Sequence, residues 1–333
     1  MRRVLGLIAV LAILWSGWWF IASEGLRGGL TGWLDTRIAA GWQAEVADVE
    51  MAGFPTDLRA RMVEPKLADP VTGIAVEMED LTLAAPAWWP GHATLKLPET
   101  PMLLASPQGR SFLTMTGSEM ELRLHPGTAL ELERMGWTAG PWGVTENAGS
   151  LMSADSLTLT MTQSGDGPAY DLNAVAAGFR PGDVPRSSLR IPEDWPLTFD
   201  ALALRGAVTF DRRWDRRAIE ERRPQPRRIR LDLAEAAWAD LRLNLAADLR
   251  VDEAGVPEGT LNIQAENWPL MLDLAQTAGL MPAGMRAEAE GWLRRLAGLS
   301  GNPNSLDVQL NLAGGFVAVG FIPIGPAPRL IIR

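Results

Sequence analysis

The stretch Leu157-Thr-Leu-Thr-Met-Thr162 alternates strictly between an apolar side chain and a threonine. Successive side chains of a β-strand point to opposite faces, so this segment presents Leu157, Leu159 and Met161 on one face and hydroxyl groups on the other. One apolar face and one polar, solvent-exposed face are typical of an antiparallel sheet that is covered on one side only. The stretch therefore predicts one strand of such a sheet.

The same alternation recurs over much of the chain. It is found in seven further segments, at residues 74–79, 119–124, 202–210, 229–233, 241–246, 261–264 and 307–312. Gly165-Asp-Gly167 and Asp252-Glu-Ala-Gly255 supply turns of the kind that join hairpin strands. We expect about ten to fourteen strands, and a sheet of that width twists until it coils, splits or closes. The predicted fold class is mainly β, with a curled antiparallel sheet that forms a groove or half-barrel.

Two segments favour helix instead. Apolar residues at helical spacing predict a short amphipathic helix over residues 26–42. Asn267 is suited to cap a later helical region, and residues 268–297 predict a helical hairpin within the series of strands. A hairpin beside a one-sided sheet is suited to cover part of the open apolar face.

The first part of the chain has the features of a membrane span. Residues 4–22 carry no charge, and about 19 residues in a helix cross the roughly 30 Å of a bilayer's hydrocarbon. Arg2 and Arg3 favour a cytoplasmic location for residues 1–3, which sends residues 24–333 across the membrane. Tryptophans cluster at the far end of the span, where indole rings favour the membrane interface.

The alternative to an anchor is a cleaved signal peptide. A basic start, an apolar run and the small residue Ala22 fit that interpretation. The run is long for a signal peptide, however, and the bulky Phe20 lies where cleavage after Ala22 requires a small residue. Both interpretations deliver the rest of the chain to the same compartment. The absence of Cys excludes lipid modification at an N-terminal Cys, disulfides and Cys-based metal sites.

Length and charge limit the remaining classes of protein. The chain has 333 residues and a formal net charge of −9, which argues against a general nucleic-acid binder. The region after the span is long enough for one elongated β domain or two smaller ones. The proline-rich segment 181–196 is either a linker between two halves of residues 24–333 or a long loop within one domain.

The sequence contains no recognisable catalytic constellation. The two histidines, His92 and His125, lie beside Gly or Pro in apparent turns, where side chains are usually solvated. No nucleophile elbow, phosphate-binding loop or dinucleotide fingerprint occurs. Acidic pairs such as Glu119 and Glu121 share the wet face of a predicted strand, which explains them without acid–base chemistry. We therefore expect no catalytic residue, no cofactor and no metal, and a protein that is not an enzyme.

The densest charge lies between Asp211 and Arg230. This segment holds nine Arg and four acidic residues, a local balance of +5 in an acidic protein. One interpretation is a solvated loop between two strands, with or without a short helix. The other is a surface that docks on anionic headgroups or on an acidic partner. The candidates for such docking are Arg212, Arg213, Arg216 and Arg217.

A wide one-sided sheet leaves an apolar face to be covered. Leaving apolar area in water costs about 25 cal/mol per Å², and monomeric proteins rarely expose patches larger than a few hundred Å². The sheet must therefore close, be covered by helices or hold a ligand, and the predicted hairpin is short for the whole face. We expect an apolar trough that binds an acyl chain. Its candidate wall residues are Leu122, Leu124, Leu159, Leu243, Leu245 and Leu310.

Short motifs connect the chain to a known family. They are Gly53-Phe-Pro-Thr-Asp-Leu-Arg59, Pro65-Lys-Leu67, Gly314-Gly-Phe-Val-Ala-Val-Gly320 and Ile322-Pro-Ile-Gly-Pro-Ala-Pro-Arg-Leu330. With them the chain resembles a bacterial envelope family catalogued as domain of unknown function 2125, which is similar to the AsmA-like and TamB-like anchored periplasmic β proteins. The resemblance implies an inner-membrane anchor, a periplasmic curled β architecture with an apolar trough, and a link to lipid handling or outer-membrane upkeep. It supplies no catalytic residues.

Two functional hypotheses follow. The first is a bacterial inner-membrane protein, anchored once by residues 4–22, that binds or handles lipid in a periplasmic β trough. The alternative is a non-enzymatic structural or adaptor protein that binds another envelope protein, by strand addition or through the arginine-rich segment 211–230. Neither hypothesis involves nucleic acid.

Overall fold

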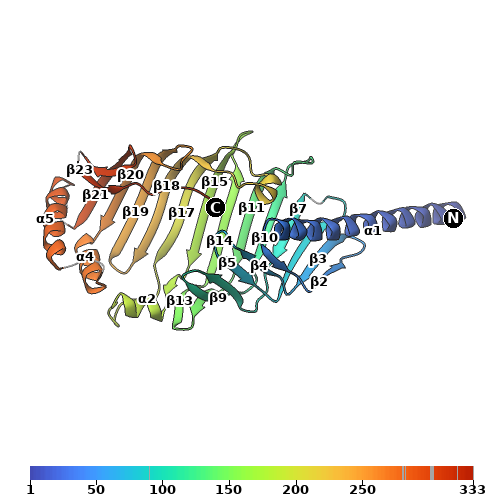
Figure 1. Cartoon of the computed structure of the whole chain (residues 1–333), viewed down its shortest axis with the longest axis horizontal. Helices are drawn as coiled ribbons and strands as arrows, with labels where there is room; N and C mark the ends of the chain where they lie inside the picture. Colours follow the sequence, from blue (N-terminus) through green and yellow to red (C-terminus); the bar gives the residue numbers. More distant parts are fainter. Residues whose placement is uncertain (90, 280, 282, 301–303, 321, 333) are drawn as a thin grey trace. The chain divides into compact units, whose positions relative to one another are not determined.

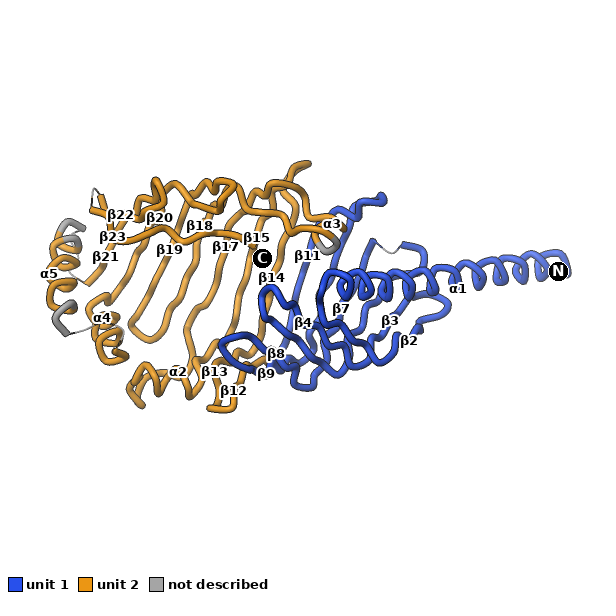
Figure 2. The backbone as a smooth tube through the Cα atoms, viewed as in Figure 1, with its two compact units in different colours: residues 1–140 blue, residues 141–333 orange. Residues whose placement is uncertain are grey.

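The computed structural model describes residues 1–89, 91–279, 281, 283–300, 304–320 and 322–332. The chain divides into two compact units, unit 1 (Met1–Gly140) and unit 2 (Pro141–Arg333) (Figure 2). Each unit consists mainly of antiparallel strands, and the sheets are open. The predicted class, mainly β with a long apolar helix at the start, is confirmed. The proline-rich segment 181–196 lies within unit 2 and does not coincide with the boundary between the units.

Unit 1 begins with one continuous helix, α1 (Arg2–Ala39) (Figure 1). The helix predicted over residues 26–42 is present as far as Ala39, but it continues the apolar run and is not a short helix of its own, because no proline interrupts the chain and both segments share one packing face. Trp19 and Leu26, two turns apart on that face, pack together with Leu58. The helix therefore continues past the predicted span and carries the chain onto its first strands.

The rest of unit 1 forms two antiparallel sheets. The strands of the larger sheet, in order, are β2 (Asp48–Ala52), β3 (Asp57–Val63), β6 (Asp80–Pro86), β7 (His92–Lys96), β10 (Glu119–Leu124) and β11 (Leu132–Ala139). Those of the smaller sheet are β1 (Gln43–Glu45), β4 (Lys66–Asp69), β5 (Ile74–Glu77), β8 (Met102–Ser106) and β9 (Gly109–Met115). All pairings within them are antiparallel, as the alternating sequence predicts.

Unit 2 is built around an antiparallel meander whose strands follow the order of the chain. They are β14 (Ser156–Gln163), β15 (Ala169–Ala177), β17 (Ala201–Phe210), β18 (Pro226–Trp238), β19 (Leu241–Val251), β20 (Pro257–Glu266), β21 (Ser305–Ala313), β22 (Phe316–Val319) and β23 (Ile322–Pro326). A small second sheet contains β12 (Trp142–Glu146), β13 (Gly149–Ala154) and β16 (Arg180–Pro181). The helices are α2 (Asp183–Ser188), α3 (Arg217–Glu220), α4 (Trp268–Thr277) and α5 (Ala283–Ser300).

All eight stretches with a period of two overlap strands. The described residues nevertheless form 23 strands, so the prediction of ten to fourteen is wrong. Several additional strands are too short to show a period, such as β1 with three residues and β16 with two. These short strands belong to the smaller sheets, and their pairing is visible only in three dimensions.

The two late helices cover one end of the unit 2 sheet (Figure 1). Trp268 and Leu272 of α4 are buried in a core that they share with Leu306 and Val308 of β21. The predicted helical hairpin over residues 268–297 is therefore confirmed, and it packs on the apolar face of the sheet. Within unit 2, α5 contacts β21 and α4 contacts β19, whereas α2 contacts β13.

Candidate functional site

The apolar face of the unit 2 sheet alternates between leucine and alanine from strand to strand. Along one row of directly paired residues, Leu159 of β14 lies opposite Ala174 of β15, and Ala174 lies opposite Leu204 of β17. The row continues through Ala234 of β18 to Leu245 of β19. Large and small side chains therefore follow each other across five neighbouring strands.

A second row, one step along the strands, repeats the alternation. Leu202 of β17 pairs with Ala236 of β18, which pairs with Leu243 of β19. Leu157 of β14 pairs with Ala176 of β15. Adjacent strands are about 4.8 Å apart, so the leucine ridges on either side of an alanine strand are separated by roughly 9.6 Å. Strands β15 and β18 consequently form the floors of shallow channels.

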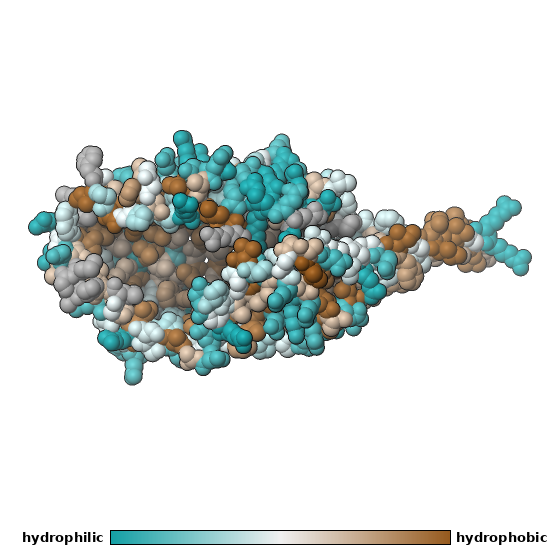
Figure 3. Space-filling view, in the orientation of Figure 1, coloured by the Kyte–Doolittle hydropathy of each residue, from teal (hydrophilic) through white to brown (hydrophobic). Residues whose placement is uncertain are grey.

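These channels belong to an apolar groove of about 280 Å³. Figure 3 shows hydrophobic residues gathered in a hollow over the unit 2 sheet. Leu204 is 38% exposed there, although leucines on an apolar sheet face are usually buried. Among the lining residues, Val175, Ala203 and Glu235 point to the opposite face and contribute backbone atoms. The lining set is Leu157, Ala174, Val175, Ala176, Leu202, Ala203, Leu204, Ala234, Glu235, Ala236, Leu243 and Leu245.

Two other parts of unit 2 cover the apolar face beyond the groove. On the side of α4 and α5, Leu243 packs against the core beneath the helices. Farther along the strands, Leu330 packs on Leu249 and Leu312. The segment that carries Leu330 is held in place because the Gln225 side chain forms hydrogen bonds with both the backbone N–H (3.0 Å) and the carbonyl (2.8 Å) of Ile332.

Aromatic residues stand at both ends of the strands that form the groove. Where β17 begins and β18 ends, Phe199 stacks on Trp238, with ring centroids 4.8 Å apart. The Trp238 indole donates a hydrogen bond to the carbonyl of Pro196 at 2.9 Å, which holds the ring in place. At the opposite end, Tyr170 and Phe210 meet edge to face at 5.9 Å. Aromatic pairs therefore pack at both ends of these strands, outside the lining of the groove.

The predicted trough residues are found in both units. Leu243 and Leu245 line the groove, and Leu159 lies on the same face opposite Ala174. Leu310 is covered, because it packs against the core beneath α4 and α5 and against the neighbouring core at Leu312. Leu122 and Leu124, the remaining two, lie in β10 of unit 1.

Most residues that shape the groove are not among the predicted trough residues. They are the alanines of the groove floor, together with three leucines beside them: Ala174, Ala176, Ala234, Ala236, Leu157, Leu202 and Leu204. The alternating alanines of residues 174–177 and 234–237 are a signal that could have identified the floor. The predicted set consisted of leucines alone, and leucines form the ridges.

Other grooves have a chemistry that does not suit a hydrocarbon chain. A groove of about 720 Å³ in unit 1 runs between α1 and the first strands, and charged residues such as Arg27, Asp48 and Lys66 line it. A second, of about 610 Å³, lies on the polar face of the unit 2 sheet beside Asn262 and Asp307. The smaller unit 2 groove is therefore the better apolar site despite its size.

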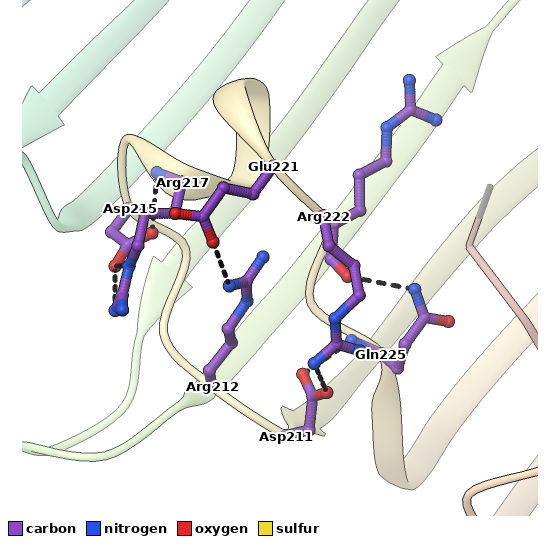
Figure 4. A network of polar contacts seen from close by, with 8 residues as sticks. Asp211, Arg212, Asp215, Arg217, Glu221, Arg222 and Gln225 are labelled. Atoms are coloured by element: carbon purple, nitrogen blue, oxygen red, sulfur yellow. Dashed lines mark hydrogen bonds and ion pairs between the residues drawn. The ribbon is translucent and has the colours of Figure 1, made fainter.

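The arginine-rich segment 211–230 consists of the loop between β17 and β18, interrupted by the short helix α3, and of the first residues of β18. Figure 4 shows that its own acidic residues face its arginines. Arg217 reaches Oδ2 of the buried Asp215 through Nε at 2.9 Å and Nη2 at 2.7 Å. Nη1 of Arg212 lies 3.7 Å from Oε2 of Glu221. These contacts neutralise part of the positive charge within the loop.

The remaining docking candidates lie on the same loop. Arg213 donates a hydrogen bond to the carbonyl of Asp166 in the turn before β15. Arg216 precedes the first turn of α3. No contact of the loop with an anionic surface follows from this geometry, so the docking role of the four arginines stays a prediction.

Asp211 anchors the base of the loop. Its carboxylate accepts a hydrogen bond from the backbone N–H of Gln225 at 2.8 Å and lies 2.9 Å from Nη2 of Arg222. Partial burial acts to raise the pKa of Asp211, but the Gln225 N–H and the Arg222 guanidinium outweigh it and hold the pKa below its usual value. The ionised carboxylate therefore ties the start of β18 to the end of β17.

The two histidines lie in unit 1. His92 begins β7 and lines a polar groove of about 350 Å³ together with Arg123 and Arg134. The backbone N–H of His125 donates to the carbonyl of Glu131 at 2.8 Å, in the connection between β10 and β11. Among the described residues, no three His, Asp or Glu side chains gather where they could hold a metal ion. That the protein is not an enzyme stays a prediction.

Fold and groove together define a class of protein: a mainly β protein with open antiparallel sheets, a helix long and apolar enough to cross a membrane, and an apolar groove on one sheet. The chain belongs to the family described as an uncharacterized protein conserved in bacteria (DUF2125), whose model matches residues 19–328. No curated protein matches the chain. The family match does not extend to the AsmA-like and TamB-like proteins, and that relationship stays a prediction.

Proposed function

We propose that the protein is anchored once in the bacterial inner membrane by α1 and binds the acyl chain of a lipid in the groove of unit 2, in the periplasm. The observation that carries the lipid-binding proposal is Leu204, which remains 38% exposed between two alanine strands on an otherwise apolar face. An acyl chain lying along β15 or β18 would fill the missing side-chain volume. The protein acts in this proposal by binding and not by catalysis.

The size of the groove limits what it accepts. Small-ligand pockets usually measure roughly 300–1,000 Å³, and the groove of about 280 Å³ is just below that range. Its floor offers alanines and its ridges offer leucines, with no charged side chain pointing into it. One hydrocarbon chain fits this description better than a complete phospholipid. The headgroup would then remain outside, in contact with water or with a partner.

The packing of α1 favours an anchor over a cleaved signal peptide. The indoles of Trp15 and Trp19 donate hydrogen bonds to the carbonyls of Pro55 and Asp57, at 2.9 and 2.8 Å. Trp19 is also buried against Leu58. Cleavage after Ala22 would remove both donors and expose this core, which supports retention of the helix in the mature protein.

A second candidate function is adaptor binding by strand addition. The last strand of the unit 2 sheet, β23, exposes Ile322 and Ile324, and a partner strand could cover them. Pro323 and Pro326 remove two backbone N–H donors from this strand, which weakens it as a template. The acyl-chain proposal therefore has the stronger support. A kinship with AsmA-like and TamB-like proteins is compatible with both functions.

The test counts lipid bound to the full-length protein. After purification from membranes in detergent, native mass spectrometry and solvent extraction should find close to one tightly held lipid per chain. Leu204→Gln should lose it, because an amide on the ridge between the two alanine strands disfavours a hydrocarbon chain.

Val175→Gln is the matched control for that substitution. Val175 is 37% exposed, almost the same as Leu204, but its side chain points to the opposite face of the neighbouring strand. Both variants keep α1, so lipid that surrounds the helix contributes equally to each. Equal lipid content in the two variants would contradict the groove as the binding site and favour the adaptor function.

A further inference from the structure

Three indoles attach α1 to two loops of unit 1. Besides the bonds from Trp15 to Pro55 and from Trp19 to Asp57, the Trp18 indole donates to the carbonyl of Ala87 at 3.2 Å. These carbonyls belong to the turn that precedes β3, to the first residue of β3 and to the loop that follows β6. Both loops are therefore fixed at the height of Trp15 to Trp19 along the helix.

This height falls short of the length needed to cross a bilayer. Trp15 and Trp19 follow Val4 by eleven and fifteen residues, which places them roughly 17 and 23 Å along a helix with a rise of 1.5 Å per residue. The hydrocarbon core is about 30 Å thick, and any tilt of the helix shortens these heights further. If α1 spans the membrane from Val4, the two loops lie inside the far edge of the bilayer and not above it.

The composition of the loops agrees with that depth. Residues 53–56 (Gly-Phe-Pro-Thr) and 85–89 (Ala-Pro-Ala-Trp-Trp) contain no charged side chain. Phe54 is 53% exposed and Trp88 is 63% exposed, so large aromatic rings face outward from both loops. The Phe54 ring also stacks on the exposed Phe20 of α1, with centroids 6.5 Å apart. Figure 3 shows hydrophobic residues continuing along the protruding helix toward its hydrophilic start.

We propose that the loops 53–56 and 85–89, together with Phe20, form an aromatic wedge that enters the lipid interface beside α1. Aromatic rings favour the interfacial region, where the apolar body and the polar edge of the ring are both solvated. The occupant of this exposed surface is the bilayer itself, because the surface is continuous with an apolar helix of membrane-spanning length. The inference rests on the proposed anchoring by α1 and is independent of the acyl-chain groove.

The test uses the absence of Cys from the chain, which makes a single introduced Cys a unique attachment point. Phe54→Cys and Trp88→Cys are spin-labelled in the full-length protein and reconstituted into vesicles of phosphatidylethanolamine and phosphatidylglycerol. Collision rates of the label are measured with oxygen, which partitions into lipid, and with a water-soluble nickel chelate. Val71→Cys is the control, since Val71 lies in unit 1 and is 89% exposed.

The wedge predicts several-fold lower nickel collisions at positions 54 and 88 than at 71, with higher oxygen collisions. Labels at 54 and 88 that meet the nickel chelate as readily as the label at 71 would overturn the proposal. Shielding from both reagents would overturn it as well, because it would indicate burial against a protein partner. An unchanged melting temperature in all three variants establishes that the fold is intact. A C-terminal topology reporter separates failure of the wedge from failure of the anchor.

Discussion

The indole Nε1 of Trp19 donates a hydrogen bond to the backbone carbonyl of Asp57 at 2.8 Å, between residues 38 positions apart in the chain. Trp19 lies in the apolar run of α1, and Asp57 is the first residue of β3. The bond joins the membrane-span candidate to the edge of the folded unit. It fixes the direction in which the helix leaves unit 1, so the helix is an integral part of that unit.

Substitution of Trp19 by Phe should destabilise unit 1 while keeping an apolar ring in the core. The partly buried carbonyl of Asp57 loses its donor, and a hydrogen bond contributes about 0.5–1.5 kcal/mol, so the melting temperature of the full-length protein should fall. Trp292→Phe provides the control, because Trp292 is exposed in α5. Equal melting temperatures for the two variants would mean that the Trp19 bond contributes little to stability.

Filling the floor of the groove should abolish lipid retention without loss of stability. Ala234→Leu adds a ridge where β18 presents a small side chain, so the channel between Leu204 and Leu245 is closed. Ala246→Leu makes the same change on the polar face of β19. We expect lipid retained by native mass spectrometry to disappear only in Ala234→Leu. Retention in both variants would argue that the lipid binds elsewhere.

Replacement of Arg217 by Gln should lower stability more than replacement of Arg213. The Asp215 carboxylate is almost completely buried and accepts two hydrogen bonds from the Arg217 guanidinium, and hydrogen bonds to a charged group contribute about 1.5–3 kcal/mol. Arg213 instead contacts the carbonyl of Asp166, which lies in an exposed turn. Thermal unfolding of Arg217→Gln and Arg213→Gln compares the two directly. A larger loss of stability in Arg213→Gln than in Arg217→Gln would contradict the pairing of Arg217 with Asp215.

Asp211 should make stability depend on pH in the acidic range. Its pKa is lower in the folded than in the unfolded chain, so the stabilisation is complete above the unfolded pKa of about 4 and is lost as the pH falls through the folded pKa. Asp211→Asn should therefore melt below the wild type at pH 7, and the difference should shrink below about pH 4. Melting curves from neutral to acidic pH measure it. If the difference in melting temperature between Asp211→Asn and the wild type stays constant from neutral to acidic pH, the carboxylate charge is not its cause.

The anchor predicts that the mature protein keeps its first residues and lies mostly across the membrane. Intact mass spectrometry of membrane-purified protein should find residues 1–22 still attached, because Trp15, Trp18 and Trp19 are hydrogen-bonded to unit 1. A periplasm-active reporter fused to the C-terminus should be active. A mass that corresponds to cleavage after Ala22 would establish the signal-peptide interpretation.

The class of the fold and the membrane-span candidate at the start of the chain can be predicted from local sequence patterns. Alternation such as Leu157-Thr-Leu-Thr-Met-Thr162 specifies strands, because side chains of an extended backbone point to opposite faces whatever the partner strand. The uncharged residues 4–22 likewise identify a potential membrane span from length and polarity alone. The hairpin over residues 268–297 followed from a change of period from two to helical spacing. These are local properties of the chain.

Which apolar residues contact one another depends on the three-dimensional fold. Leu204 and Ala234 are thirty positions apart, and strand register places them side by side. The small side chain of Ala234 then forms the floor of the groove beside the larger Leu204. Leu310 carries the same local pattern but is covered by its neighbours in the folded unit. The pairing of Arg217 with Asp215 also needed coordinates, since several acids lie within reach in the sequence. Register, covering and pairing depend on contacts between distant segments, and local periodicity carries no information about them.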